Sequence, residues 1–408
     1  MGEGRGSLPP RFGRGRMRGT LSVDAEEAQP PPDRHPGRSR LAVTALALAA
    51  ALDLAACSGG AASSPAAPTL QAASSPVLTT APAAAQQHLS ETGSSLMAPL
   101  FALWGPAYQA KFSQVRISTT TSSSGTGISS AAAGTTDIGA SDAYLSPADV
   151  TEHASLVNIP LAVAALAVIY HVPGLSPSTH LKLNGTVLAR IFAGRITTWN
   201  DPAIKNLNPG VTLPGTTIVL VHRADTSGST FLFTSYLNAQ DPADWSSALI
   251  GTAVAWPSQP GEQGAQGSSG LIAAVHATPG SIGYVGVSYL STVRGDGEGE
   301  VALGNSAGNY VLPTAGTIQA GLASFTNTPV NETISLINGS GAEVYPIINY
   351  EYAIVNTSQG SASRAQDLRA FLDWAITTGT AQLAQVNFQP LPPSVLTLSQ
   401  AQIAKIKG

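Results

Sequence analysis

The chain has 408 residues, a formal net charge of −4 and only 11% charged residues. This length suits about two or three domains, and beyond the first 40 residues no basic stripe or cluster indicates nucleic-acid binding. A single cysteine excludes both a disulfide within the chain and a zinc site of several cysteines. The seven histidines show no metal-ligand spacing, so the sequence predicts neither a metal nor a cofactor.

The N-terminal region is unlike the rest of the chain. Residues 1–40 hold eight Arg against five acidic residues and are rich in Gly and Pro, which predicts disorder. The apolar tract 41–52 follows Arg38 and Arg40 and is too short to span a membrane as a helix, which is typical of a secretory signal. We therefore expect residues 1–56 to be a disordered start followed by a signal peptide.

The only cysteine, Cys57, ends the run Leu54-Ala55-Ala56-Cys57, which resembles a bacterial lipobox. That resemblance implies that Cys57 carries lipid (palmitate), becomes the new N-terminus and anchors the chain to the outer face of the cell membrane. The alternative is an ordinary signal peptide that happens to end near a cysteine. Residues 57–87 are mostly Ala, Ser, Pro and Thr, and we expect them to form a tether between the membrane and the folded part.

Patterns of helix and strand alternate from His88 onward, which favours an α/β architecture. The expected helices cover residues 96–112, 181–194, 231–237, 271–276 and 368–376. The expected strands cover residues 115–120, 156–170 (one strand or two), 217–221, 281–285 and 345–355.

Four loops rich in small hydroxyl residues and glycine stand out between these elements, at residues 91–99, 121–128, 136–142 and 222–230. In the last of them Ser227-Gly228-Ser229 lies between an expected strand and an expected helix. A helix N-terminus presents unpaired N–H groups and a partial positive charge, and so favours an anion. Arg223 adds a planar charged fork suited to an oxyanion. The alternative for this loop is a capped helix beside an exposed arginine.

Five blocks together resemble the phosphate-binding proteins of bacterial phosphate ABC transporters, and most of all the actinobacterial and mycobacterial lipoprotein type. The blocks are Gly93-Ser94-Ser95 with Pro99, Gly139-Ala140-Ser141-Asp142, Arg223-Ala224-Asp225-Thr226-Ser227-Gly228, Thr278-Pro279-Gly280-Ser281-Ile282-Gly283-Tyr284-Val285 and Tyr345-Pro346-Ile347-Ile348-Asn349-Tyr350-Glu351-Tyr352. The resemblance covers residues 88–408. It implies a type II periplasmic-binding-protein fold, in which two α/β lobes joined by a hinge enclose a ligand cleft. Residues 88–165 and 340–408 would form lobe I, and residues 166–339 would form lobe II.

The same resemblance implies a phosphate site and the partners of a transport protein. The implied phosphate ligands are Ser95, Leu96 (through its backbone N–H), Ser124, Asp142, Arg223, Ser227, Gly228 and Ser229. The implied partners are inorganic phosphate and the membrane permease and ATPase subunits of a phosphate ABC transporter. From Cys57 onward the chain has 12 Lys and Arg against 18 Asp and Glu, so an anion would have to be held by a local site.

Asp142 is the unexpected member of this set, because a carboxylate repels an anion. Its presence makes sense if the ligand carries a proton to donate, as phosphate does at neutral pH and sulfate does not. A buried carboxylate facing sulfate would lack a donor, which is costly. The alternative role for Asp142 is to cap a turn before Ser146-Pro147.

Several other functions are possible on the same fold. A secreted phosphatase would need a nucleophile and a base, and only His222 lies near Ser227 in the sequence. A surface antigen would not need the Arg223 and Asp142 pair. Binding of sulfate or molybdate would not need a carboxylate acceptor at Asp142.

Overall fold

A computed structural model describes residues 81–83 and 87–408. The predicted disordered start, signal peptide, Cys57 and most of the tether lie outside the described residues. All of the described residues fall within one compact unit.

A nine-stranded mixed sheet forms the centre of the described residues, with the order β2-β1-β3-β12-β4-β8-β6-β7 and with β9 paired to β4. Its strands are β1 (Gln87–Gly93), β2 (Val115–Thr121), β3 (Ile138–Ser141), β4 (Leu156–His171), β6 (Val219–Arg223), β7 (Gln263–Ala265), β8 (Ser281–Gly286), β9 (Gly299–Glu300) and β12 (Ile348–Asn356). A second, small sheet is formed by β5 (Lys182–Leu183), β10 (Ala302–Gly304) and β11 (Tyr310–Val311).

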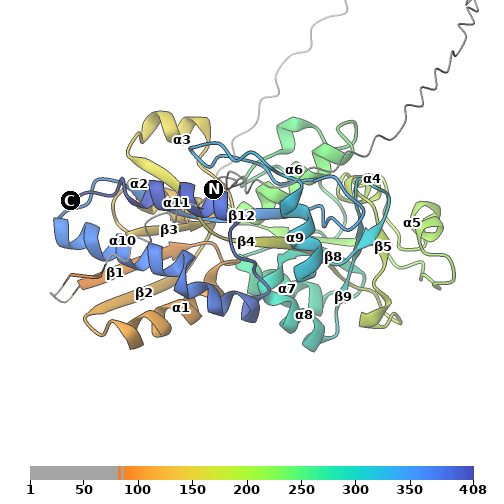
Figure 1. The fold of residues 1–408 in the computed structure, drawn as a ribbon. Helices are drawn as coiled ribbons and strands as arrows, with labels where there is room; N and C mark the ends of the chain where they lie inside the picture. Colours follow the sequence, from red (N-terminus) through yellow and green to blue (C-terminus); the bar gives the residue numbers. More distant parts are fainter. Residues whose placement is uncertain (1–80, 84–86) are drawn as a thin grey trace, which may run out of the picture. The chain divides into compact units, whose positions relative to one another are not determined.

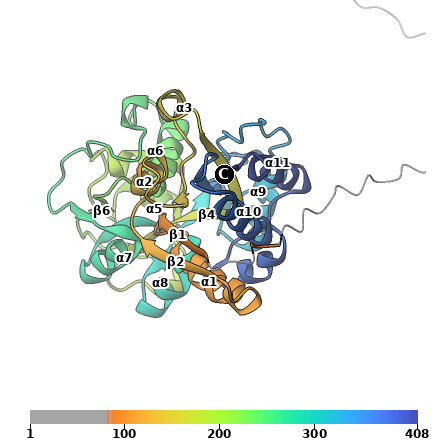
Figure 2. The ribbon, with the colours of Figure 1, turned by 90° about the vertical axis from the view of Figure 1, so that its left-hand side faces the viewer.

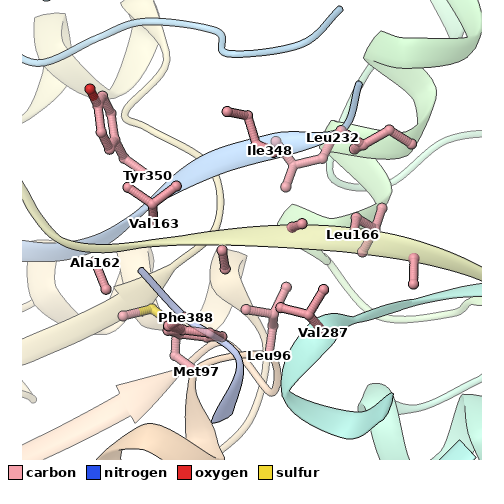
Figure 3. Packing of buried hydrophobic residues seen from close by; sticks show 14 of the residues in the cluster. Leu96, Met97, Ala162, Val163, Leu166, Leu232, Val287, Ile348, Tyr350 and Phe388 are labelled. Carbon is pink, nitrogen blue, oxygen red and sulfur yellow. The ribbon is translucent and has the colours of Figure 1, made fainter. Parts of the chain in front are cut away.

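The long strand β4 connects the two halves of the large sheet (Figure 1). Residues 156–165 pair with β12, and residues 166–171 pair with β8, so β4 changes partner between Ala165 and Leu166. Nearly every β4 side chain is buried, which is expected for a strand covered on both faces. Figure 3 shows this packing: Ile348 and Leu232 lie on one side of β4, and Leu96, Val287 and Phe388 lie on the other.

Helices surround the two halves of the sheet (Figures 1 and 2). They are α1 (Ala98–Lys111), α2 (Ser124–Ala132), α3 (Pro147–Glu152), α4 (Gly185–Phe192), α5 (Pro202–Leu207), α6 (Gly228–Gln240), α7 (Gly267–Ala277), α8 (Leu290–Asp296), α9 (Ala315–Ala323), α10 (Ala362–Ile376) and α11 (Pro393–Ile403). The first and tenth pack through aromatic rings: Tyr108 of α1 lies edge-on to Phe371 of α10, with ring centroids 5.1 Å apart. The prediction of an α/β architecture is confirmed.

Three sequence-based boundaries were wrong in informative ways. Residues 138–141 form the buried strand β3, although their small side chains were interpreted as part of a loop. The helix expected from residue 181 begins at Gly185, because Asn184 caps it by accepting a hydrogen bond from the Val187 N–H, and residues 182–183 are a strand. Helix α7 begins at Gly267, four residues before the expected start, and this brings Ser268 into its first turn.

Candidate functional site

Asp142 directly follows β3 and is almost completely buried, with 1% of its surface exposed. Each carboxylate oxygen accepts a hydrogen bond from a serine hydroxyl: Oδ1 from Ser94, which follows β1, and Oδ2 from Ser229, at 2.7 Å, in the first turn of α6. Its backbone N–H donates to Ser124 Oγ over 3.2 Å. The predicted residues Asp142, Ser124 and Ser229 therefore do come together, and Ser94 joins them.

Burial raises the pKa of the Asp142 carboxyl above its ordinary range. The hydrogen bonds from Ser94 and Ser229 and the positive charge of Arg223 offset part of that rise, because each of them favours the ionised carboxylate. Asp142 is thus a buried carboxylate held in place by hydroxyl donors, and not the turn cap that was its alternative role.

The N-termini of α2 and α6 meet beside Asp142. Ser227 is the N-cap of α6, with its side chain accepting from the Thr230 N–H at 3.3 Å. Gly125 of α2 donates its N–H to the carbonyl of Thr226 over 2.9 Å. A Cβ at Gly228 would lie 2.6 Å from Ser124 Oγ and 2.8 Å from Asp142 Cβ, so this contact requires glycine. Two helix N-termini, each with a partial positive charge, therefore point into one small region.

Arg223 ends β6 and is buried, with 5% exposed, which excludes the alternative of an exposed arginine. Its guanidinium makes a bidentate ion pair with Asp225, in which Nε donates to Oδ1 over 2.6 Å. Its backbone N–H donates to the Tyr284 hydroxyl over 3.2 Å. The sequence did not indicate Asp225 as a partner, although it is only two residues away. The ion pair with Asp225 holds the Arg223 guanidinium in one orientation and balances its positive charge inside the protein.

Ser95 and Leu96 are held by residues far along the chain. The Ser95 hydroxyl shares a 2.9 Å hydrogen bond with Ser268 Oγ and accepts from the Ser268 N–H at 3.0 Å. The Ser95 carbonyl accepts from the Tyr289 hydroxyl over 2.8 Å. The Leu96 carbonyl accepts from the Ser288 hydroxyl, also over 2.8 Å, so both predicted residues contact the segment that follows β8.

The Leu96 N–H, which the sequence predicts as a ligand donor, donates to Ser94 Oγ over 3.1 Å. The Leu96 side chain is fully buried and packs against Gly286, where a Cβ would lie 2.2 Å from Leu96 Cγ. Figure 3 shows Leu96 on the same side of β4 as Val287. Leu96 therefore has a packing role that the sequence did not indicate.

A polar cavity of about 340 Å³ adjoins these residues. Its walls are formed by the loop at residues 91–99, the segment that leads into α2, Asp225 and the start of α7. The lining residues are Ser95, Thr121, Ser122, Ser123, Thr126, Asp225, Gln266, Gly267, Ser268 and Ser269. Ser268 and Ser269 precede the helix expected from residue 271, and the sequence did not connect them to the site.

A second cavity, of about 560 Å³, is larger but less suited to an anion. It lies between α2 and α6, and Ile128, Tyr144 and Phe231 contribute to its walls, as do Asp149 and His153. Neither cavity is lined by an arginine or a lysine. The 340 Å³ cavity is the better candidate because hydroxyl side chains form most of its wall, and because Ser95 and Asp225, the partner of Arg223, line it.

Residues 81–83 and 87–408 contain no group of three or more His, Cys, Asp and Glu side chains suited to a metal ion. Within the same residues no helix is both long and apolar enough to cross a membrane.

Comparison with known proteins gives a consistent family. The profile of the PBP superfamily domain matches residues 78–378. The phosphate-binding protein PstS of Xylella fastidiosa (strain 9a5c) is 31% identical over 315 residues, which cover 77% of this chain and 84% of that protein. PstS 3 of Mycobacterium leprae (strain TN) is 30% identical over 320 residues, which cover 75% and 83%.

A solved structure supports the same fold. It is the periplasmic phosphate-binding protein PfluDING bound with phosphate, which is 20% identical, has a TM-score of 0.63, and matches over 77% of this chain and 93% of that one. The predicted type II periplasmic-binding-protein fold is thus confirmed, with a mixed α/β sheet. With these matches along most of its length, the chain belongs to the PBP superfamily and, within it, to the PstS phosphate-binding proteins.

Proposed function

We propose that this chain is an extracytoplasmic solute-binding protein that captures inorganic phosphate for import by an ABC transporter. The observation that carries the proposal is the buried Asp142, which lies among serine hydroxyls and helix N-termini and within the field of the buried Arg223. Relatives named phosphate-binding protein PstS support the same ligand. Nothing in this arrangement favours a phosphatase or a surface antigen.

The proposed phosphate ligands are the predicted ones: Ser95, Leu96, Ser124, Asp142, Arg223, Ser227, Gly228 and Ser229. Hydroxyl and backbone N–H groups would bind the anion without adding full charges, and Arg223 would add one charge-assisted contact. Asp142 would accept the hydrogen bond of a P–OH group. Sulfate and other fully deprotonated oxyanions have no such proton and would leave the buried carboxylate facing an unpaired oxygen.

Calorimetric titration of the anion-free chain with phosphate and with sulfate tests this proposal. We expect one-to-one phosphate binding and no detectable sulfate binding. The Asp142→Asn variant should gain sulfate affinity relative to phosphate by about tenfold or more, because an amide can donate to sulfate.

The Arg223→Ala variant should lose most of its phosphate affinity. Arg195→Ala, at an arginine whose side chain is 71% exposed, is the matched control and should bind like the parent. If the parent protein binds neither anion, or if Asp142→Asn keeps the selectivity of the parent, the proposed site is wrong.

The partner change of β4 supports a division into two lobes. We propose that residues 88–165 and 340–408 form lobe I and residues 166–339 form lobe II, with β4 passing from one to the other between Ala165 and Leu166. Lobe closure over phosphate would present the loaded protein to the membrane permease, which an ATPase subunit drives.

We propose that a lipid on Cys57 anchors the protein to the cell membrane. The position of the only cysteine, directly after an apolar tract, supports this anchor. Mass spectrometry of the protein from its own cells should find an acylated N-terminal cysteine in the membrane fraction. Cys57→Ser should move the protein to the soluble fraction. If the wild-type protein carries no lipid, the lipid anchor is wrong and the alternative of an ordinary signal peptide holds.

A further inference from the structure

Glu351 is a carboxyl group that the phosphate site described above does not use. It lies in the middle of β12 and is fully buried, with 0% exposed. In the antiparallel pairing of β12 with β3, Tyr352 is opposite Ser141, so the next step along the ladder puts Glu351 across from Asp142. A shift in the register of β12 with β4 falls between Glu351 and Tyr352, and such a bulge redirects a side chain.

The Glu351 carboxyl group lacks hydrogen-bond donors around it in the described part of the chain. Among the described residues, no hydroxyl, amide or cation makes a well-formed hydrogen bond to either of its carboxyl oxygens. The Asn349 amide, which lowers the pKa of Glu351, donates to the main-chain carbonyls of Asp142 (2.5 Å) and Tyr350. The Tyr352 hydroxyl is also used elsewhere, since it donates to the Glu332 carbonyl over 3.1 Å. A buried ionised Glu351 would therefore lack the partners that a charge requires.

Asp142 and Glu351 influence each other strongly. Burial raises the pKa of Glu351 well above its ordinary value, and the neighbouring charge of Asp142 raises it further. Two buried carboxyl groups that act on each other cannot easily both ionise in a dry site. Asp142 has Ser94, Ser229 and the charge of Arg223 to stabilise its ionised form, and Glu351 has no comparable support. These partners favour Glu351 over Asp142 as the carrier of a shared proton.

The titratable groups outside β12 that act on its residues beside Glu351 are Glu332 and Tyr144, and both of them act on Tyr352. Helices α2 and α9 contain no titratable side chain, and the titratable residues of β4, Tyr170 and His171, lie in the part paired with β8. The positive charge of Arg223 favours the ionised form of Asp142, and the Asn349 amide is the group that lowers the pKa of Glu351.

We propose that Glu351 is a positioning residue for Asp142: its carboxylic acid donates a hydrogen bond to the Asp142 carboxylate and keeps that group in the ionised form that accepts P–OH. This inference rests on the proposed phosphate function and deepens it. Without a donor at position 351, Asp142 would take up the proton itself and become a donor. The site would then tolerate a fully deprotonated oxyanion and lose its preference for phosphate.

Two substitutions separate this role from simple core packing. Glu351→Gln keeps a neutral donor of nearly the same shape, so it should retain the phosphate affinity and selectivity of the parent at neutral pH. Glu351→Leu fills a similar volume but removes the donor, so the ratio of phosphate to sulfate affinity should fall by about tenfold or more. In an Asp142→Asn background, the same Leu substitution should no longer change that ratio.

The pH profile gives a second test. In the parent, phosphate affinity should fall at alkaline pH as Glu351 loses its proton and a second negative charge appears beside Asp142. Glu351→Gln has no proton to lose and should show a flatter profile. A merely structural role would change the melting temperature of the variants and leave both the selectivity ratio and the pH profile unchanged, and that result would overturn the proposal.

A measurement without ligand distinguishes failure of this inference from failure of the phosphate function. The infrared difference spectrum between the parent and Glu351→Gln at neutral pH should contain the band of a protonated carboxyl group. If the band is present but phosphate does not bind, the carboxyl pair stands, and both the phosphate function and the role of Glu351 in it fail. If phosphate binds and the band is missing, Glu351 is not the proton carrier. If Glu351→Leu fails to fold, the pH profiles of the parent and of Glu351→Gln still test the proposed role of Glu351.

Discussion

Gly228 is the residue at which α6 packs against the residues around Asp142. A Cβ there would meet Ser124 Oγ at 2.6 Å and the Ala143 nitrogen at 2.8 Å, and the backbone at Ala143 cannot move aside as a flexible side chain could. The glycine thus permits a close approach of two segments that carry proposed phosphate ligands. Its importance lies in its missing side chain, since its φ is not in the left-handed region.

We therefore expect Gly228→Ala to weaken phosphate binding and to lower the free energy of unfolding by about 1–3 kcal/mol, because the added methyl group would push the starts of α2 and α6 apart. Calorimetry and denaturant unfolding would measure these two effects. Gly316→Ala, in the first turn of α9, is the matched control, since the nearest atom to its Cβ is 4.0 Å away. It should leave binding unchanged and stabilise the protein slightly. Parent-like binding by Gly228→Ala would show that the close approach is not needed.

Some site residues could be predicted from the sequence and others could not. Ser227, Gly228 and Arg223 lie in one strand-loop-helix segment, so local chemistry alone marks them. Ser268 contacts Ser95 across 173 positions, and Glu351 faces Asp142 through a strand ladder. Such contacts depend on tertiary pairing, which residue types and spacing do not reveal. Asp225 is two residues from Arg223, and the pairing of a buried arginine with the nearest carboxylate in the sequence could have identified it.

At the scale of elements, hydrophobic periodicity and capping located most of the helices. The aromatic residues of α1 and α10 repeat at helical spacing and pack on each other, so both helices were expected. Strand β3 was missed because Gly139-Ala140-Ser141 has the composition of a loop. It is a strand because it pairs with β1 on one side and with β12 on the other. Pairing on both sides outweighs the weak strand preference of small residues.

Strand β4 shows the same dependence on tertiary structure. Its apolar run suggested one or two core strands, and the structure has a single strand, Leu156–His171. Hydrophobic periodicity cannot show that the first part of β4 pairs with β12 and the second part pairs with β8. That shared strand gives one continuous sheet to two halves that each contribute to the site: Asp142 follows β3 in one half, and Arg223 ends β6 in the other.

Over the whole described part of the chain, several buried carboxyl groups have raised pKa values. Burial raises the pKa of Glu91 to about 8, and burial likewise raises that of Glu332 to about 8, from an ordinary value of 4.5. Burial also raises the pKa of Glu351 well above that ordinary value, and the hydrogen bond to Glu298 raises the pKa of His276. Each of these groups binds its proton more tightly in the folded chain than in the unfolded chain. Folding is therefore favoured at low pH with respect to these groups.

The sign of the pH dependence of stability follows from this tighter proton binding in the folded chain. The stabilising contribution of Glu91 is complete below about pH 4.5 and declines until the pH passes about 8, because the unfolded chain releases its proton first. Each such group gives a slope of at most about 1.4 kcal/mol per pH unit. We expect the free energy of unfolding of the phosphate-free protein to fall between about pH 5 and about pH 8, as measured by denaturant titration.

Glu91→Gln removes one of these groups and should make that decline shallower. Glu152→Gln, at an exposed position in α3, is its control and should keep the slope of the parent. Acid-labile proteins show the opposite trend, because their paired carboxylates have lowered pKa values. Stability that rises with pH across this interval would mean that Glu91 and Glu332 are ionised in the folded protein, which would contradict the prediction.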